Sequence, residues 1–545
     1  MQNQDQVVET KTCTHCQSHF EITQWDMDFY DKISPTFQTS LSEGEGSRVR
    51  FQIPTPTLCP NCRQRRRLSF RNERKLYRRQ CDASQKSIIS MYAPSPSETN
   101  PSAFGTSPYQ GRLKVYDQTI WWSDSRDPMD YGMNFDFSKS FTENFGELMV
   151  NVPRLSLINM NSENSEYCNP WLSNKNCYMV NSITNSEWCV YGRRVDSCDF
   201  CFDCYAIESS QHCSNSIQLK NCFSCHFSSQ LEDCSNCWWC VWLMGKSYYI
   251  NNNQYSKEEY FNQIKNTSTK IKEPIPQLFD IWNENCLDCK IIFNSSNCIS
   301  CSDVRQSSDL TYCEMVKPWC YDCIDCTLLI WSKLNKEVMS TLRIEKCIGA
   351  ISCWDGINIF YCDNCYNCSD CFGCIWLRNK QYCIFNKQYT KEEYEEQVAK
   401  IIQHMMTTGE RGEFFHPSLS PFGYNETVAQ EYFPLHAVGT QYLASDLEDV
   451  CDTSLQWINF ANFGYKRSTY ESPTPQVDKV IKWQDLPDSI TDVNDDILKV
   501  AIQCEVSGKP FRIIPQELAF YRKHNIPLPR KHPDVRHLER MELRK

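Results

Sequence analysis

The sequence predicts a mainly β protein built around a narrow, cysteine-rich β-solenoid with 12-residue coils. An N-terminal zinc ribbon and a degenerate C-terminal ribbon flank the solenoid, and a few helices complete the fold. Three observations lead to this prediction. Cysteine recurs at every twelfth position in the middle of the chain, two Cys-x2-Cys pairs lie near the N-terminus, and the C-terminal residues repeat the N-terminal spacing.

The twelve-residue period is the strongest of these signals. An aliphatic residue follows each cysteine by six positions, and three positions before it small or polar residues share the place with cysteine. The cysteines are Cys177, Cys189, Cys201, Cys213, Cys225 and Cys237. Repeats of fixed period indicate a stacked structure. Twelve residues are too few for a helical hairpin, but they can close one β-coil that bonds to the next at about 4.8 Å.

Part of the solenoid is duplicated. Residues 234–264 recur as residues 368–398, an offset of 134. Both copies contain Tyr-Ser/Thr-Lys-Glu-Glu-Tyr, which is typical of a helix start, with Ser256 and Thr390 as the N-caps. We therefore expect two solenoid blocks, each followed by a helix.

The predicted segments follow one another along the chain. They are 1–82, a zinc ribbon with an arginine-rich helix; 83–167, a β cap or connector over the first coil; 168–247, the first block; 248–285, helix and linker; 286–381, the second block; 382–410, helix; 411–500, an extended wrap; and 501–545, a degenerate ribbon.

The four N-terminal cysteines predict one structural metal site. Cys13 and Cys16 form one Cys-x2-Cys pair, and Cys59 and Cys62 form the other. Two such pairs supply the four thiolates of a closed tetrahedral Zn²⁺ site. Phe20, Ile22, Phe29 and Tyr30 are expected to form the small core that this metal helps to fold.

A basic run follows the last of these cysteines. Positions 63–79 hold nine cations and one acid, Glu73, and a helix there would place Phe70 and Tyr77 on one face. The cations are Arg63, Arg65, Arg66, Arg67, Arg71, Arg74, Lys75, Arg78 and Arg79. Such density can neutralise phosphates, which favours RNA, the ribosome or DNA as a partner. The alternatives are a solvated face, or a clamp on the carboxylates of this acidic chain itself.

The solenoid cysteines are candidates for further metal. Two sets have the spacing C-x2-C-x8-C-x2-C and could accept Zn²⁺ or an iron–sulfur cluster. One set is Cys222, Cys225, Cys234 and Cys237, and the other is Cys286, Cys289, Cys298 and Cys301. However, the same places in other coils hold Asn174, Ser186, Ser210 and Ile359, so buried thiol stacks are the favoured interpretation.

The C-terminal ribbon retains the spacing of the first ribbon without its ligands. Cys504 precedes Phe511 by seven residues, as Cys13 precedes Phe20. The four ligand places hold Cys504, Ser507, His532 and Val535. Two of these four cannot ligate zinc, so we expect this copy to be free of metal.

Residues 1–82 resemble the zinc-ribbon domains of treble-clef type, in the cysteine pairs, Phe20, Phe29-Tyr30 and Cys59-Pro-x-Cys62-Arg. The order of the whole chain resembles a family of uncharacterised cysteine-rich proteins of small-genome bacteria. The motifs are Cys-Arg-Gln-x-Arg-Arg, the two Tyr-x-Lys-Glu-Glu-Tyr helices, SPFGYNE and FYRKHN. These resemblances imply an architecture and a metal, but no reaction.

Composition bounds the function. The chain has 35 cysteines among 545 residues and a net charge of −11. The polar start MQNQDQVVETKT and the absence of a long apolar run lead us to expect a cytoplasmic protein with reduced thiols and no membrane span. With no nucleophile elbow, phosphate-binding glycine loop or HExxH, we expect a non-enzymatic zinc-binding scaffold that docks on nucleic acid. The alternatives are a scaffold for acidic protein partners, and a multi-metal storage or redox protein.

Overall fold

The computed structural model describes residues 6–40, 48–94, 112–124, 126–169, 171–267, 344–434, 463–466 and 477–542, with short segments between 302 and 339. These residues form two compact units. Unit 1 contains Met1–Asn72, Tyr77–Ser156 and Phe279–Tyr470, and unit 2 contains Glu73–Leu76, Leu157–Leu278 and Glu471–Lys545. Each unit therefore combines segments that are distant in sequence. Each contains one solenoid block together with hairpin structure from other parts of the chain.

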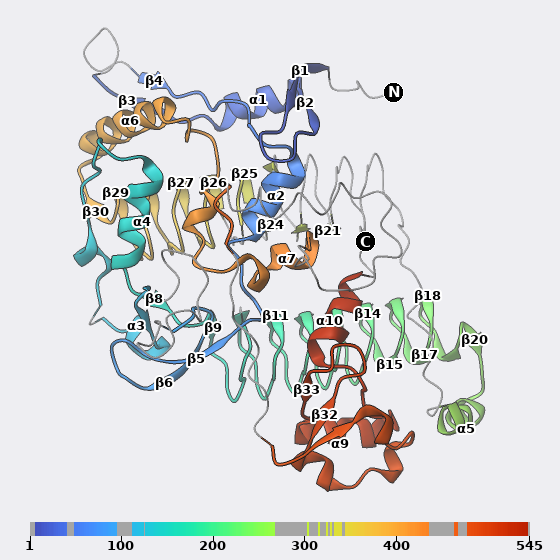
Figure 1. The fold of residues 1–545 in the computed structure, drawn as a ribbon. Coiled ribbons are helices and arrows are strands. Elements are labelled where there is room, and N and C mark those ends of the chain that lie inside the picture. The colour runs from blue at the N-terminus through green and yellow to red at the C-terminus, as the bar shows by residue number, and fades with distance from the viewer. Residues whose placement is uncertain are drawn as a thin grey trace. The chain divides into compact units, whose positions relative to one another are not determined.

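Figure 1 labels many of the elements of unit 1. Its N-terminal and connecting elements are β1 (Val7–Thr12), β2 (His19–Thr23), α1 (Gln24–Ile33), β3 (Thr36–Gln38), β4 (Arg48–Arg50), α2 (Pro60–Leu68), β5 (Tyr77–Gln80), β6 (Ser87–Ser90), β7 (Val115–Tyr116), α3 (Gln118–Trp122), η2 (Pro128–Tyr131), α4 (Phe141–Asn151) and β8 (Arg154–Leu155). Its solenoid strands are β21 (Ser302–Val304), β22 (Glu314–Val316), β23 (Cys323–Ile324), β24 (Thr327–Leu329), β25 (Ser332–Lys336), β26 (Ile344–Ile348), β27 (Ile357–Phe360), β28 (Ser369–Phe372), β29 (Gln381–Ile384) and β30 (Lys387–Gln388). Then follow α6 (Lys391–Thr407), η3 (Pro417–Leu419), η4 (Tyr424–Glu426) and α7 (Val428–Tyr432).

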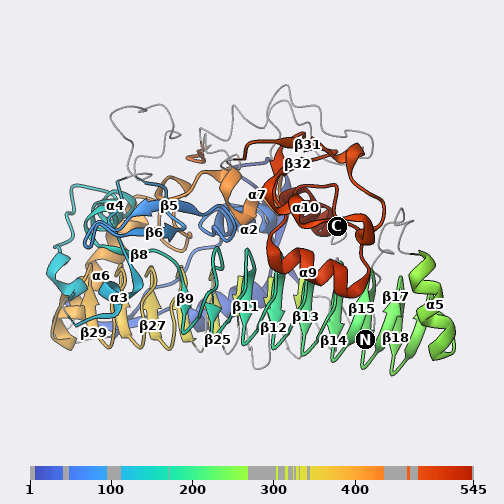
Figure 2. The ribbon, with the colours of Figure 1, turned by 90° about the horizontal axis from the view of Figure 1, so that it is seen from below.

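Unit 2 carries the first solenoid block, whose strands succeed one another along the stack in Figure 2. Its solenoid elements are β9 (Asn159–Met160), β10 (Trp171–Leu172), β11 (Asn181–Thr184), β12 (Arg193–Asp196), β13 (Tyr205–Glu208), β14 (Ile217–Lys220), β15 (Phe223–His226), β16 (Ser229–Glu232), β17 (Ser235–Trp238), β18 (Val241–Met244), β19 (Ser247–Ile250), β20 (Asn253–Gln254) and α5 (Lys257–Thr267). Its C-terminal elements are β31 (Val480–Lys482), η5 (Trp483–Asp485), η6 (Ile490–Asp492), η7 (Asp495–Lys499), β32 (Ala501–Gln503), β33 (Pro510–Phe511), α9 (Pro515–His524) and α10 (Pro533–Glu542).

The predicted β-solenoid with 12-residue coils is confirmed. The strands are parallel, and each residue pairs with the one twelve positions later, as Ile183 pairs with Val195 and Val195 with Ile207. Every third residue from Asn176 to Trp242 has a positive φ, so each coil has four corners. None of these corners is Val, Ile or Thr, because β-branched side chains are strongly disfavoured in the left-handed region. The coil is therefore a four-sided turn with three residues to a side.

The residue after each corner points inward, which gives four interior ladders. The ladder of Cys177 to Cys237 and the ladder of Ile183 to Leu243 are the two predicted ladders, and their members lie in one buried cluster or pack against it. A third ladder runs from Asn174 to Cys234, at the place where the sequence alternates between cysteine and small or polar residues. The sequence interpretation missed the fourth ladder, which holds Val180, Gly192, Cys204, Ser216, Ser228 and Cys240.

Hydrogen bonding explains why Cys, Ser and Asn replace one another on these ladders. Ser210 Oγ donates to the Glu208 carbonyl at 2.9 Å and accepts from the Cys222 N–H at 3.1 Å. Asn174 links two coils in the same way, by donating to Ile183 O and accepting from the Ser186 N–H. Each inward side chain must be small and must satisfy buried backbone groups of neighbouring coils.

The second block has the same corners. Positive φ recurs at every third residue from Gly349 to Tyr382, and Cys353, Cys362, Cys365, Cys368, Cys371 and Cys374 are buried inside the coils. Both predicted helices follow their blocks. Thr390 accepts the Glu393 N–H at the start of α6, and Ser256 accepts the Glu259 N–H at the start of α5.

Two local predictions are wrong. The connector 83–167 is not purely β, because Ser140 and Glu143 form a capping box that starts α4. Within unit 1, moreover, its residues around Gly132 lie against the last coil of the second block, where Met133 N donates to Phe385 O at 3.0 Å. The arginine-rich helix ends at Leu68, and Tyr77 begins strand β5, so Phe70 and Tyr77 do not share a helix face.

Candidate metal centre

Two local structures bring the four N-terminal cysteines together. Cys13 and Cys16 lie in the turn between β1 and β2, where Cys13 N donates to Ser18 O at 2.9 Å and Gln17 adopts a φ of 62°. Cys59 is the N-cap residue of α2, and Cys62 lies in the first turn of that helix. Pro60 suits the first helical position because its missing N–H would have no partner there.

The four sulfurs form a compact group. The Sγ atoms of Cys13, Cys16, Cys59 and Cys62 all lie within 4.8 Å of one another, and those of Cys16 and Cys59 are 3.5 Å apart. Zn–S bonds of about 2.3 Å in a tetrahedron separate sulfurs by about 3.8 Å. The donor set and its spacing therefore fit a metal ion that prefers four thiolates.

The electrostatics of the group favour a thiolate. Hydrogen bonds from the Cys59 and Cys62 thiols lower the pKa of Cys13 well below its ordinary value. The bond to Cys13 in turn raises the pKa of Cys59 to about 11. Three of the cysteines are buried in a small core with Phe20, Ile22 and Leu58, while Cys16 is exposed. The predicted core residues Phe29 and Tyr30 are also buried.

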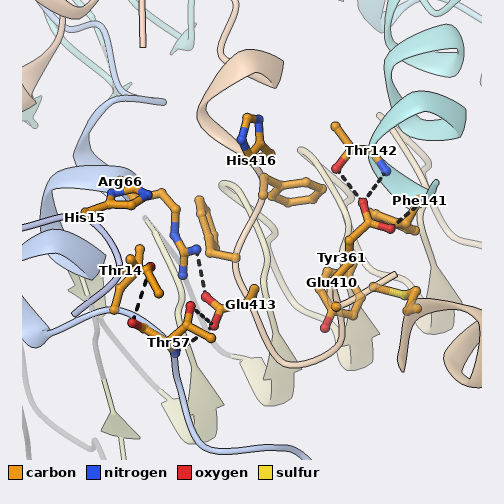
Figure 3. Close-up of a pocket in the computed structure, with 15 residues that line it drawn as sticks. Thr14, His15, Thr57, Arg66, Phe141, Thr142, Tyr361, Glu410, Glu413 and His416 are labelled. Atoms are coloured by element: carbon orange, nitrogen blue, oxygen red, sulfur yellow. Dashed lines mark hydrogen bonds and ion pairs between the residues drawn. The ribbon is translucent and has the colours of Figure 1, made fainter. Parts of the chain in front are cut away.

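A cavity of about 240 Å³ adjoins this group in unit 1 (Figure 3). Thr14 and His15 of the β1–β2 turn and Thr57 and Leu58 before Cys59 form part of its wall. The rest comes from Phe141, Thr142, Tyr361, Met405, Gly409, Glu410 and residues 413–416, with Arg66. His15 stacks on Phe463 with 3.9 Å between ring centroids, and burial lowers the pKa of His15 to about 4.

The two acids of the cavity are engaged with the protein itself. Glu413 accepts from Thr57 N at 3.0 Å and lies 2.8 Å from the Arg66 guanidinium. Glu410 accepts from the N–H groups of Phe141 and Thr142 at 2.8 and 2.9 Å, at the N-terminus of α4. The segment 410–413 thus ties the loop before Cys59 to α2 and to α4.

The basic run is mostly buried. Arg63, Arg66, Arg67, Arg71 and Arg79 are buried, Arg65, Arg74 and Lys75 are half-buried, and Arg78 is exposed. Phosphate groups could not reach the five buried guanidinium groups without opening the fold, which corrects the expectation that all nine cations face a partner. The sequence did not show this burial because most of the partners are distant in the chain.

Several of these cations form ion pairs with carboxylates of this chain. In unit 1, Arg66 lies 2.6 Å from Glu337, and Arg79 lies 2.8 Å from Asp82. In unit 2, Arg74 and Lys75 both bind Asp534, at 2.9 and 2.8 Å. These pairs match the alternative of a clamp on the chain's own carboxylates.

The solenoid cysteines do not gather as metal ligands in the parts that the structure describes. There, three or more potential ligand atoms come together only at Cys13, Cys16, Cys59 and Cys62. The thiol of Cys222 donates to the carbonyls of Lys220 and Leu231 at 3.3 and 3.4 Å, and that of Cys234 donates to Glu232 O at 3.2 Å. Cys225 and Cys237 make similar contacts. The second candidate set, Cys286, Cys289, Cys298 and Cys301, lies outside the described residues.

In the C-terminal hairpin, the cysteine at the first ligand place accepts backbone hydrogen bonds. Cys504 Sγ accepts from the N–H groups of Ser507 and His532 at 3.4 and 3.2 Å. His532 precedes α10 as Cys59 precedes α2. The hairpin β32–β33 pairs Ile502 with Phe511, which matches the pairing of Lys11 with Phe20.

A third hairpin of this kind was missed. Cys81 lies between β5 and β6, its Sγ accepts from Ser84 N at 3.4 Å, and Asp117 N, just before α3, donates to it at 3.2 Å. Arg79 pairs with Ile88, the register of the other two hairpins. The signal was present in the sequence, since Ile88 follows Cys81 by seven residues and Ser84 follows it by three, as around Cys504.

Comparison with protein-family models, with curated proteins and with solved structures finds no match for this chain. The group of four N-terminal cysteines is therefore the feature that carries the likeness to a zinc ribbon. Among the described helices, none has the length and apolar character needed to cross a membrane.

Proposed function

We propose that this chain is a zinc-binding scaffold protein in which one Zn²⁺, held by Cys13, Cys16, Cys59 and Cys62, fixes the N-terminal ribbon. The observation that carries the proposal is the convergence of four sulfurs within 4.8 Å. A metal held by four protein thiolates has no open position for a substrate, so its contribution is to folding. The stacked coils supply a regular support, and the paired acids of the adjoining cavity support a structural role.

Elemental analysis of the full chain, purified without oxygen, tests this proposal. We expect one zinc per chain, lost in Cys13→Ser. Cys81→Ser and Cys504→Ser are matched controls, because each removes a cysteine from the same kind of hairpin turn, and both should retain the zinc. Absence of metal would refute the proposal. Several metals or iron would favour the storage or redox alternative.

Docking on RNA, the ribosome or DNA, in the cytoplasm, stays a prediction. The exposed Arg78 is the member of the basic run best placed for such a partner or for an acidic protein. Binding of RNA to the full chain should weaken with salt and fall in Arg78→Glu. Lack of binding at low salt would exclude nucleic acid and leave the acidic protein partner. Arg66→Glu is unsuitable as a test, because it would place a third acid beside Glu337 and Glu413.

A further inference from the structure

Both solenoid blocks end in the same way. At the last coil, the side-chain amide of one asparagine bonds both backbone groups of a residue eleven positions earlier. Asn252 accepts from Val241 N and donates to Val241 O, both at 2.9 Å. Asn386 does the same with Ile375, both at 2.8 Å. The side-chain amide therefore takes the place of a peptide group of a further coil. Asn252 and Asn386 are 134 positions apart, which is the offset between the two duplicated segments.

In the second block this last coil is covered. Ile375, Trp376, Leu377, Phe385 and Asn386 are all 0% exposed. The cover is formed by residues 121–124 and 126–137 of unit 1, which comprise the end of α3, η2 and the extended residues that follow.

The cover makes aromatic and backbone contacts. Trp121 packs on Trp376 with 4.5 Å between ring centroids. Asn386 Nδ2 also donates to Pro128 O at 3.1 Å. A Cβ on Gly132 would lie 2.5 Å from the backbone carbonyl oxygen of Asn386, so only glycine fits at that position.

In the first block the equivalent coil is open among the residues that the structure describes. Met244, the counterpart of Arg378, is 67% exposed. Val241, Trp242 and Leu243 are only half-buried, whereas their three counterparts are fully buried. Asn252 is exposed as well. An apolar coil end of this kind is an edge at which a strand or extended segment of another chain can add.

We propose that the open coil end at residues 241–252 binds an extended segment of a partner protein. The segment would carry a glycine to lie against Asn252 and a large aromatic side chain to lie on Trp242. This is the chemistry of residues 121–124 and 126–137, which close the duplicate coil. A second copy of the chain, stacked on this one by a solenoid coil, is a poorer fit. It would place a coil corner at the position where the last coil of the second block accepts Gly132. The inference extends the proposed scaffold function, but it rests on the duplicated coil and not on the metal.

A peptide with the sequence of residues 119–137 of this chain is a direct probe. We expect saturable binding of the labelled peptide to the full chain, measured by fluorescence anisotropy. Met244→Glu should weaken binding at least tenfold, because it places a charge on the apolar coil end. Val506→Glu is the matched control, since it introduces the same charge at an exposed apolar residue of the C-terminal ribbon. Gly132→Val in the peptide should also abolish binding.

Three outcomes would overturn the proposal. They are no saturation at millimolar peptide, equal affinity in Met244→Glu, and a concentration-dependent dimer that Met244→Glu dissociates, which would make a second copy the occupant. Chemical unfolding of each variant confirms that it is folded. Zinc content measured on the same samples separates failure of the metal proposal from failure of this one.

Discussion

The Arg66 guanidinium lies 2.6 Å from the Glu337 carboxylate, and the two side chains are only 6% and 1% exposed. Arg66 also lies 2.8 Å from Glu413. A charge so deeply buried is stable only while its partners remain, because the protein interior does not solvate it. The pair connects α2, the helix that carries Cys62, to the second solenoid block within unit 1.

Replacing Glu337 with Gln should therefore destabilise unit 1 strongly. We expect the free energy of unfolding in urea to fall by about 3 to 5 kcal/mol, the usual cost of breaking a buried ion pair. Asp31→Asn removes a carboxylate from the exposed pair with Arg50 and should cost less than about 1 kcal/mol. A loss below about 1 kcal/mol in Glu337→Gln would contradict the assigned role of the pair.

The Glu517 carboxyl should make the stability of unit 2 depend on pH. Burial raises its pKa from 4.5 to about 7, and the nearby Asp203 adds to the effect, although Arg536 opposes it. A raised pKa favours the protonated carboxyl in the folded state. The contribution of protonated Glu517 to the free energy of unfolding is therefore complete below about pH 4.5 and is lost as the pH rises through about 7.

The expected loss between pH 4.5 and 8 is roughly 3 kcal/mol. Thermal unfolding of the wild type and of Glu517→Gln at several pH values measures it, and the variant should lack this dependence. Equal slopes for the two proteins would show that another group titrates.

The interior ladder should tolerate Ser210→Cys but not Ser210→Val. Cysteine occupies the same ladder at Cys198 and Cys222, and its thiol can still contact the Glu208 carbonyl. Valine would leave the buried Cys222 N–H without a partner, at a cost of about 1 to 3 kcal/mol. Denaturant unfolding compares the two variants, and equal stability would argue that the ladder needs only a small side chain.

The terminal asparagines offer a matched pair. Asn386→Ala would leave the buried N–H and C=O of Ile375 unpaired and should cost about 2 kcal/mol or more. Asn252→Ala at the exposed end should cost less, because water can replace the amide, and the strain of alanine at a φ near 60° is common to the two variants. Hydrogen exchange at Ile375 and Val241 reads each site separately. Similar protection losses would show that the two ends are equally covered.

Much of the fold could be predicted because its signals are local or exactly periodic. The twelve-residue recurrence of Cys177 and its equivalents required stacked coils, and the capping residues Ser256 and Thr390 marked two helix starts. The cross-section could have been inferred too, since no β-branched residue stands at the corner positions from Asn176 to Trp242. Cys81 was missed because a single cysteine with one serine lacks the second ligand pair.

The coil period, the side chains that line the coils and the four cysteines of the candidate metal centre all follow from the order of residues along the chain. The folded arrangement determines which cations are buried, because Arg66 pairs with Glu337, which is 271 residues away in the chain. It also determines that residues 121–124 and 126–137 close the second block, whereas the equivalent end of the first block is open among the described residues. Periodicity specifies contacts between successive coils, but burial of a charge or of a coil end depends on segments brought together by folding.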